Sequence, residues 1–451
     1  MAETELPKYY TSMYKLYDGK KTILYEQLSN GKFATYNVKK NKVELFNNIE
    51  LAERIVLPLN NKITQKKAIP LPSGAVEYGS TLGLIDEIDK HINKYADLPN
   101  AFMKLGTWFI LMTWVKDNLT SINYLRFLGD FGSGKTRAWN VFGRLCYKPI
   151  MLGASHRVAP LYRLQDVWQG TMCLDECVLK DSDESSDIIQ VLNAGIEKGV
   201  FVPRCDTNDS NEVDLFDPFG PKVISSRASF IDDAIESRCI TNKMKKTRRK
   251  NIPINLTRAF FKEETELRNK LLMFRFRNWE QVNADNILKT ELPETDRRLQ
   301  QMMAPFAVTF HEFPKIIGDL NEFMIGYYDK QVEYASGTVN GGIVKAMLEM
   351  FVECKIQITS SDILSKMKEL GYETGYLRDN TIGKKRKGLG VEAKQMVFRD
   401  NKGKSVSKMS IIWDKDLMEA LMKQYVPMKD REKYINLFKK SSNPGGPELV
   451  W

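Results

Sequence analysis

The sequence predicts an α/β fold built around a parallel sheet. From Asn123 to about residue 240, short apolar runs typical of buried strands alternate with longer helical patterns. One apolar run leads into the glycine-rich segment 129–136, and another ends in Asp175-Glu176. Because helical patterns separate the strand-like runs, the strands are expected to pair in parallel.

Length and composition limit the class of protein. A single core rarely exceeds about 250 to 300 residues, so a chain of 451 residues is expected to hold several domains. Its 43% hydrophobic residues exclude wholesale disorder. The apolar stretch Leu105–Val115 is shorter than the ~20 residues of a membrane helix, and the N-terminus shows no secretory signal. Six cysteines form no CxxC pair and there are three histidines, so we expect a cytoplasmic protein without membrane contact or zinc.

The pattern divides the chain into five regions. Residues 9–57 alternate polar and apolar side chains and break at Asp18-Gly19 and Asn30-Gly31, which are hairpin signals. Two helices are expected around 81–95 and 100–118, and the second carries Trp108 and Trp114 on a buried face. The expected regions are a small β-rich module (1–70), an α/β core with preceding helices (71–240), a helical region with a linker (241–335), a mixed helix and strand region (336–428) and a tail (429–451).

The strongest local signal fits GxxxxGK[ST] in full and lies between a strand-like and a helical pattern. It consists of Gly129, Asp130, Phe131, Gly132, Ser133, Gly134, Lys135 and Thr136. Glycines let successive backbone N–H groups converge on phosphate oxygens, and the helix N-terminus adds a favourable dipole. Lys135 is expected to reach the β- and γ-phosphates, and the Thr136 hydroxyl is expected to bind Mg²⁺. The segment therefore predicts ATP and Mg²⁺ as cofactors.

Two further strand ends and one arginine add catalytic candidates. Asp175 is expected to hold Mg²⁺, and Glu176 is expected to polarise the attacking water. At the end of the next strand-like run, Ser226, or alternatively Ser225, is expected to touch the γ-phosphate or orient the water. Arg238 is the candidate that neutralises transition-state charge, a role often filled from a neighbouring subunit.

The order of these motifs resembles that of the AAA+ ATPases. The stretch from Trp168 to Ile240 resembles the helicase-like AAA+ proteins of phages, plasmids and other mobile elements, among them the MCM-like helicases of staphylococcal cassette elements. The resemblance implies an AAA+ P-loop core with a helical lid over 241–335. It also implies a hexameric ring that hydrolyses ATP at its subunit interfaces and translocates on DNA.

The same resemblance implies two further groups of residues. Residues 199–217 would form a hairpin with Lys198 and Arg204 at its base as DNA contacts; the alternative is a structural or subunit-bridging hairpin. In the lid, Arg298, or alternatively Arg297, would sense the γ-phosphate.

The net charge of +10 is concentrated in two segments. Residues 242–250 hold six basic residues and no acid, which indicates a solvated loop or a rim contact with DNA or a partner. Residues 336–428 predict three helices and a β-hairpin, a winged helix-turn-helix that resembles the C-terminal domains of MCM-like helicases. Between residues 384 and 408, nine basic residues against two acids give +7. The expected DNA contacts there are Lys384, Lys385, Arg386, Lys387, Lys394, Arg399, Lys402 and Lys404, while winged helices also dock proteins.

Together these features predict an ATP-dependent DNA helicase or translocase, a replicative helicase or initiator-helicase of a mobile genetic element. One rival is a DNA-binding initiator or regulator that does not unwind DNA. The other is a clamp-loader-like or protein-remodelling ATPase.

Overall fold

The computed structural model describes residues 6–153, 157–177, 183–205, 212–230, 232–353, 355, 357–399 and 405–440. The chain forms two compact units. The first comprises Met1–Leu292 and Gln300–Leu320, and the second comprises Pro293–Leu299 and Asn321–Trp451. Within the described residues, no helix is both long and apolar enough to cross a membrane.

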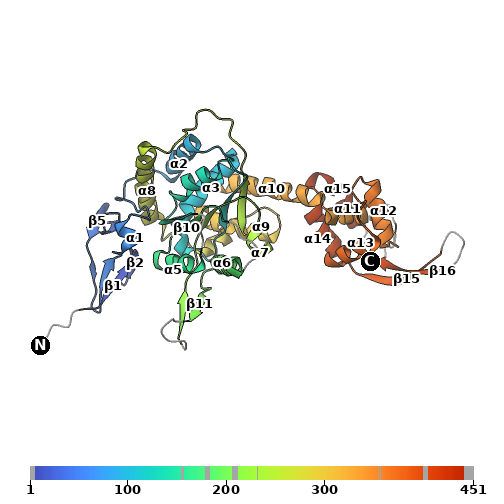
Figure 1. Ribbon diagram of the computed structural model, residues 1–451, viewed down its shortest axis with the longest axis horizontal. Helices are drawn as coiled ribbons and strands as arrows, with labels where there is room; N and C mark the ends of the chain where they lie inside the picture. Colours follow the sequence, from blue (N-terminus) through green and yellow to red (C-terminus); the bar gives the residue numbers. More distant parts are fainter. Residues whose placement is uncertain are drawn as a thin grey trace. The chain divides into compact units, whose positions relative to one another are not determined.

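The N-terminal strands of the first unit form two small sheets (Figure 1). One is antiparallel in the order β2-β3-β4-β5, and the other has the order β1-β7-β6. The two hairpin signals at Asp18-Gly19 and Asn30-Gly31 lie between antiparallel partners, and both glycines have positive φ. The elements are β1 Lys8–Thr11, β2 Met13–Tyr17, β3 Thr22–Gln27, β4 Phe33–Asn37, β5 Lys42–Phe46, β6 Ile49–Glu50, β7 Ile55–Pro58 and α1 Lys62–Gln65.

The predicted parallel sheet is confirmed. Its order is β14-β8-β13-β10-β9, and every neighbouring pair is parallel. The strands are β8 Tyr124–Leu128, β9 Pro149–Leu152, β10 Thr171–Leu174, β13 Lys222–Ser226 and β14 Cys239–Lys243. Since parallel strands need crossovers, helices α4 Lys135–Gly143, α5 Val158–Trp168, α6 Asp183–Ala194 and α7 Asp233–Glu236 lie between them in sequence.

Alternating side chains of β10 divide the two faces of this sheet. Cys173 faces α4, since a Cβ on Gly143 would lie 2.9 Å from its Sγ. Met172 and Leu174 share a buried cluster with residues of α5 and α6. The period of two along a strand therefore places α4 on one face and the α5–α6 pair on the other. The preceding helices are α2 Thr81–Tyr95, α3 Asn100–Thr113 and η1 Lys116–Asn118, and Trp108 and Trp114 are buried as expected.

Between α6 and β13 the chain forms a two-stranded hairpin, β11 Val202–Cys205 with β12 Val213–Phe216, which projects from the sheet in Figure 1. The predicted hairpin thus has its two strands, while its expected turn, residues 208–211, lies outside the described residues. After β14, no helix or strand forms before α8 Arg258–Asn278. The elements that follow are η2 Ala284–Lys289, α9 Arg297–Phe310 and α10 Pro314–Ser336.

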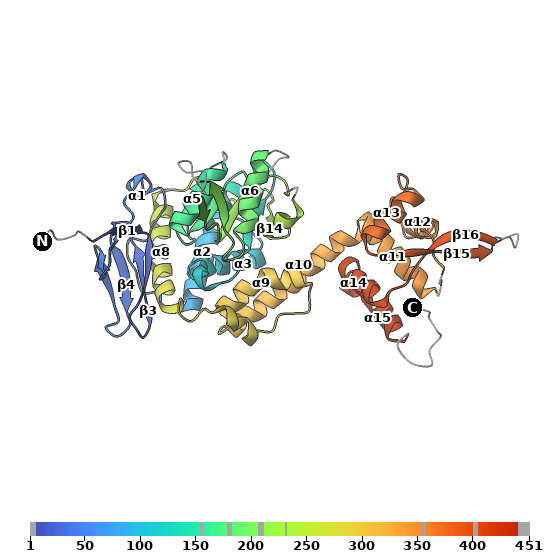
Figure 2. The same cartoon turned by 90° about the horizontal axis from the view of Figure 1, so that it is seen from below.

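The second unit contains three consecutive helices followed by an antiparallel hairpin and two more helices. Figures 1 and 2 both show the β15–β16 hairpin extending from the helices of this unit. The elements are α11 Val339–Val352, α12 Ser360–Glu369, α13 Asp379–Gly388, β15 Ala393–Arg399, β16 Ser405–Ile411, α14 Lys415–Tyr425 and α15 Met428–Lys440. Tyr434 and Phe438 of α15 are buried in the same core as α11, so the boundary expected at residue 428 cuts a core that the structure holds together.

A buried ion cluster ties the N-terminal strands to α8. The guanidinium of Arg275 donates to Glu26 Oε1 at 2.7 Å and to Asp117 Oδ1 at 2.7 Å, and its side chain is fully buried. Tyr147 and Lys148 also contact the Glu26 carboxylate. Burial alone would raise the pKa of Asp117, but Arg275 and Lys15 hold it well below its usual value. Buried charges persist only where each has partners, so this cluster fixes how β3, η1 and α8 pack.

We expect Arg275→Ala to lower the free energy of unfolding by about 3–5 kcal/mol, because it leaves two buried carboxylates without their main cation. Arg277→Ala is the matched control on the same helix. Arg277 pairs with Glu77 in an exposed position, so its loss should cost about 1 kcal/mol or less. Urea unfolding of both variants measures the difference, and equal costs would contradict the role given to the buried cluster.

Candidate active site

The segment 129–134 joins β8 to the N-terminus of α4, and its conformation depends on glycine. Gly132 and Gly134 have φ of +75° and +86°, in the left-handed region that L residues avoid. A Cβ on Gly129 would lie 2.7 Å from Ser133 Oγ and 3.1 Å from the Met244 carbonyl oxygen. The loop therefore places its backbone N–H groups at a helix start with no room for side chains, as a phosphate site requires.

Lys135 and Thr136 bring this loop together with the acid pair. Lys135 is the first residue of α4, and its Nζ lies 3.5 Å from Glu176 Oε1. The Thr136 hydroxyl donates to Asp175 Oδ1 at 3.3 Å. Residues about 40 positions apart in sequence thus meet at the carboxyl ends of β8 and β10. A hydroxyl and a carboxylate are oxygen ligands of the kind that Mg²⁺ prefers, so this pair fits the expected metal.

Ser225, rather than Ser226, contacts the acid pair. Its hydroxyl donates to Asp175 Oδ1 and accepts the N–H of Glu176 at 3.1 Å. The Ser226 hydroxyl is buried and makes no hydrogen bond in the described part of the chain. Since successive strand residues point to opposite faces, only one of the two can reach Asp175. The expectation that favoured Ser226 is therefore corrected in favour of the alternative, Ser225.

The structure adds Arg227, which was not expected at the site. Its Nη2 lies 3.0 and 2.8 Å from the two carboxylate oxygens of Glu176. This contact, with a further contribution from Lys135, lowers the pKa of Glu176. Glu176 itself has φ of +49°, a conformation that costs energy in a residue other than glycine and that is common at functional sites. The available sequence signal was that Arg227 directly follows the polar end of β13.

Arg238 lies at the opposite edge of the sheet. It precedes Cys239, which pairs with Tyr124 at the start of β8, whereas the phosphate loop follows Leu128 at the end of β8. Five strand residues at ~3.3 Å each separate the two edges by about 16 Å. The Arg238 guanidinium instead donates to Asn193 Oδ1 on α6. Arg238 is thus not brought to the phosphate loop of its own chain.

The expected contacts near the β11–β12 hairpin lie at its base. Lys198 is exposed, and its Nζ donates to the Asp117 carbonyl at 2.9 Å. Arg204 lies over the Tyr162 ring at 5.3 Å and donates to the Pro203 carbonyl. Neither position tests DNA contact, which remains a prediction.

The basic residues of the second unit fall into three groups. Lys384, Lys385 and Lys387 are exposed on α13, and Lys394 is exposed on β15. Arg386 is buried and donates to the Val391 carbonyl, so its expected DNA contact is corrected: it holds the end of α13. The Arg399 side chain, Lys402 and Lys404 lie outside the described residues. Arg298, at the start of α9, belongs to this unit, and its contact with nucleotide remains a prediction.

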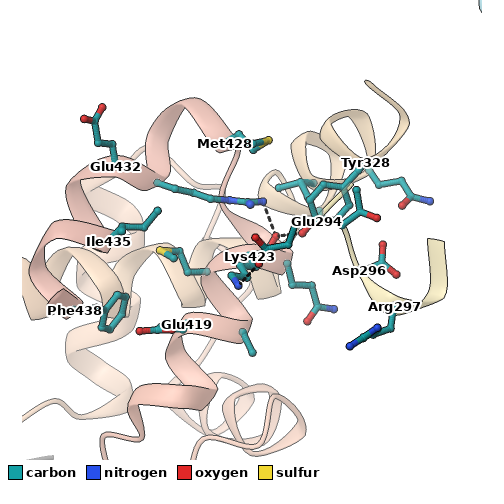
Figure 3. Close-up of a pocket in the computed structure, with 18 of the residues that line it drawn as sticks. Glu294, Asp296, Arg297, Tyr328, Glu419, Lys423, Met428, Glu432, Ile435 and Phe438 are labelled. Carbon is teal, nitrogen blue, oxygen red and sulfur yellow. Dashed lines mark hydrogen bonds and ion pairs between the residues drawn. The ribbon is translucent and has the colours of Figure 1, made fainter. Parts of the chain in front are cut away.

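A hollow of about 1250 Å³ in the second unit carries no such chemistry (Figure 3). It is lined by residues 294–297 and by side chains of α10, α14 and α15. Lys423 pairs with Glu294 at 3.0 Å, and Arg431 donates to the Val426 and Lys423 carbonyls. Acidic and basic side chains alternate around it, so it lacks the single sign of charge that a phosphate or DNA site needs.

The chain matches no protein-family model and no curated protein sequence. Its fold is similar to several solved structures. The C-terminal region of NrS-1 aligns at 11% identity with a TM-score of 0.40, covering 89% of this chain and 97% of the other. The SCCmec type IV Cch helicase aligns at 10% identity and TM-score 0.37 (98% and 77%), and a full-length MCM homolog from Methanopyrus kandleri at 13% and 0.30 (70% and 73%). These neighbours include helicases, the class that the motifs resemble, but at such scores the functional proposal rests on the site itself.

Arg227→Ala is expected to raise the pKa of Glu176, because the substitution removes the guanidinium that chiefly lowers it. The lowered pKa keeps the carboxylate ionised as pH falls, so in the variant Glu176 should protonate at higher pH, nearer its usual value of 4.5. The carboxyl ¹³C shift of Glu176, assigned with Glu176→Gln and followed from about pH 3 to 7, measures this. Arg227→Lys should shift the midpoint less, and an unchanged midpoint in Arg227→Ala would refute the contact.

Proposed function

We propose that this protein is a DNA-dependent ATPase that acts as a helicase or translocase in a ring of identical subunits, as a replicative helicase or initiator-helicase of a mobile genetic element. The supporting observation is the division of its site. Lys135, Thr136, Asp175 and Glu176 meet at one edge of the parallel sheet, while Arg238 lies at the other.

The proposed chemistry is phosphoryl transfer to water. Lys135 and the loop N–H groups bind the phosphates, and Thr136 and Asp175 hold Mg²⁺, which neutralises charge on the phosphate oxygens when it is bound. Glu176 orients a water molecule and takes its proton as the oxygen attacks the γ-phosphorus and the bond to the β-phosphate oxygen breaks. Ser225 fixes Asp175 and the backbone of Glu176 during this step.

Completion of the site requires a second chain on this proposal. Arg238 is about 16 Å along the sheet from its own phosphate loop, so it would serve the loop of a neighbour. Two large apolar side chains near the loop support an interface there. Phe131 within it is 83% exposed, and Ile254, whose carbonyl accepts from Arg137 of α4, is 90% exposed. A neighbouring subunit would remove both from water.

The second unit supplies the proposed DNA contact. Its order of three helices and an antiparallel hairpin is that of a winged helix-turn-helix, with α13 in the position of the recognition helix. The exposed ammonium groups of Lys384, Lys385 and Lys387 lie on that helix. Ammonium groups bind phosphates with little preference for base sequence, which suits a motor that moves along DNA.

The decisive experiment is unwinding of a forked DNA duplex beside a mass measurement with and without an ATP analogue. We expect strand displacement that requires ATP, DNA-stimulated hydrolysis and an oligomer in the presence of the analogue. Glu176→Gln should bind ATP but hydrolyse it at least ~100-fold more slowly, since it loses the carboxylate that takes the proton. Arg238→Ala should also be inactive alone and should recover hydrolysis when mixed with Glu176→Gln subunits, which still carry the arginine.

Each result has a counterpart that rejects part of the proposal. Hydrolysis without strand displacement would favour an initiator or regulator, and hydrolysis indifferent to DNA would favour a protein-remodelling ATPase. Full hydrolysis by Glu176→Gln would reject the catalytic assignment. Failure of the mixed subunits to recover would reject the role of Arg238 between subunits.

Replacing Lys384, Lys385 and Lys387 with alanine should weaken DNA binding and leave ATP binding unchanged. Each lost phosphate contact should reduce the slope of log affinity against log salt by about 1. Fluorescence anisotropy of labelled single-stranded DNA at several salt concentrations measures the slope. Lys366, Lys368 and Lys355, on or beside α12, form a matched triple-alanine control, and an equal effect of both triples would reject a specific role for α13.

A further inference from the structure

The basic segment after β14 lies along the phosphate loop. The Met244 N–H donates to the Leu128 carbonyl at 2.6 Å, which starts the segment beside the first residue of the loop. Met244 side-chain atoms are the neighbours of Gly129 and Gly134, the two ends of the glycine run. In the middle of the loop, the atom nearest to a Cβ built on Gly132 is Lys246 Cε, at 3.8 Å. The segment therefore follows the loop along its length.

Side-chain contacts fix the rest of the segment. The Arg249 guanidinium donates to the side chain and the carbonyl of Asn93 at 2.8 Å each, and the Thr247 hydroxyl donates to Asp97 at 2.7 Å. Further along, Arg137 of α4 donates to the Pro253 carbonyl at 2.8 Å. The path of residues 244–254 is thus set by α2 on one side and by the helix that begins the phosphate site on the other.

Lys246 differs from Lys135 in its surroundings. Lys135 is buried and lies near the Glu176 carboxylate, which already offsets part of its charge. Lys246 is exposed, and within the described residues its ammonium group makes no hydrogen bond or ion pair. Its Nζ is one bond beyond the carbon that lies against Gly132, so it is a flexible, unpaired cation beside a loop built to receive phosphate.

We propose that Lys246 is a second phosphate-binding lysine of the nucleotide site and acts in the same chain as Lys135. The segment 244–254 then forms a wall of that site, instead of a solvated loop or a rim that binds DNA. The inference rests on the proposed function, because it assigns Lys246 to the nucleotide that the phosphate loop would bind. Opposite charge held beside the triphosphate would strengthen binding and would weaken with salt.

The test compares Lys246→Ala with Lys245→Ala in the full chain, using a fluorescent ATP analogue with Mg²⁺, at low salt and without DNA. Lys245 is exposed, has the same charge and stands one position away, with no atom among the nearest neighbours of the loop glycines. We expect Lys246→Ala to raise Kd about fivefold or more, Lys245→Ala to raise it less than twofold, and Lys246→Arg to stay near wild type. The fivefold effect should shrink as salt is raised.

Two further arms separate the possible failures. If wild type binds the analogue, Lys135→Ala abolishes that binding and Lys246→Ala matches Lys245→Ala, only the role of Lys246 is overturned. If wild type binds no nucleotide, the proposed function fails and the inference fails with it. If Lys246→Ala weakens single-stranded DNA binding and leaves the nucleotide Kd unchanged, the residue is a DNA rim contact and the inference is rejected.

Discussion

The parallel register of β8, β13 and β10 is the constraint on which the candidate site depends. Leu128 pairs with Ser226, and Leu174 pairs with Ile224, so the three strands end nearly level. The loop that follows one strand and the acids that follow another therefore meet at one edge. Hydrogen bonds from Thr136 and Ser225 to Asp175 are a consequence of that register. A slip of one residue in β13 would turn Ser225 away from Asp175.

Local motifs were sufficient to predict the parts of the site that one segment of chain builds. Glycines with positive φ and a helix start are properties of the loop alone, so the phosphate segment could be predicted, as could the strand that carries Asp175. The choice between Ser225 and Ser226 depends on which face of β13 meets β10. The pairing of Arg227 with Glu176 and the burial of Arg386 depend on packing between segments, for which a single sequence has no signal.

Charge concentration also has a different meaning in each of the two basic segments. In 243–250, Arg249 is bound to α2 and Met244 packs on the loop, so the segment is built into the fold beside the phosphate loop. On α13, by contrast, Arg386 turns inward while its lysine neighbours remain exposed. The same composition thus describes a structural wall in one place and an exposed cationic helix face in the other. Counting charges in the sequence does not separate the two.

The contact between Arg238 and Asn193 suggests how the two edges of the sheet would act together on the proposed function. Asn193 is on α6, which leads through Lys198 into the β11–β12 hairpin. Tyr124, at the start of β8, also donates to the Leu192 carbonyl on α6. The arginine that would enter a neighbour's site and the hairpin that would meet DNA are therefore positioned by the same helix. A displacement of the hairpin that moved α6 would change where the Arg238 guanidinium is held, so DNA position and hydrolysis next door would be linked through one rigid element.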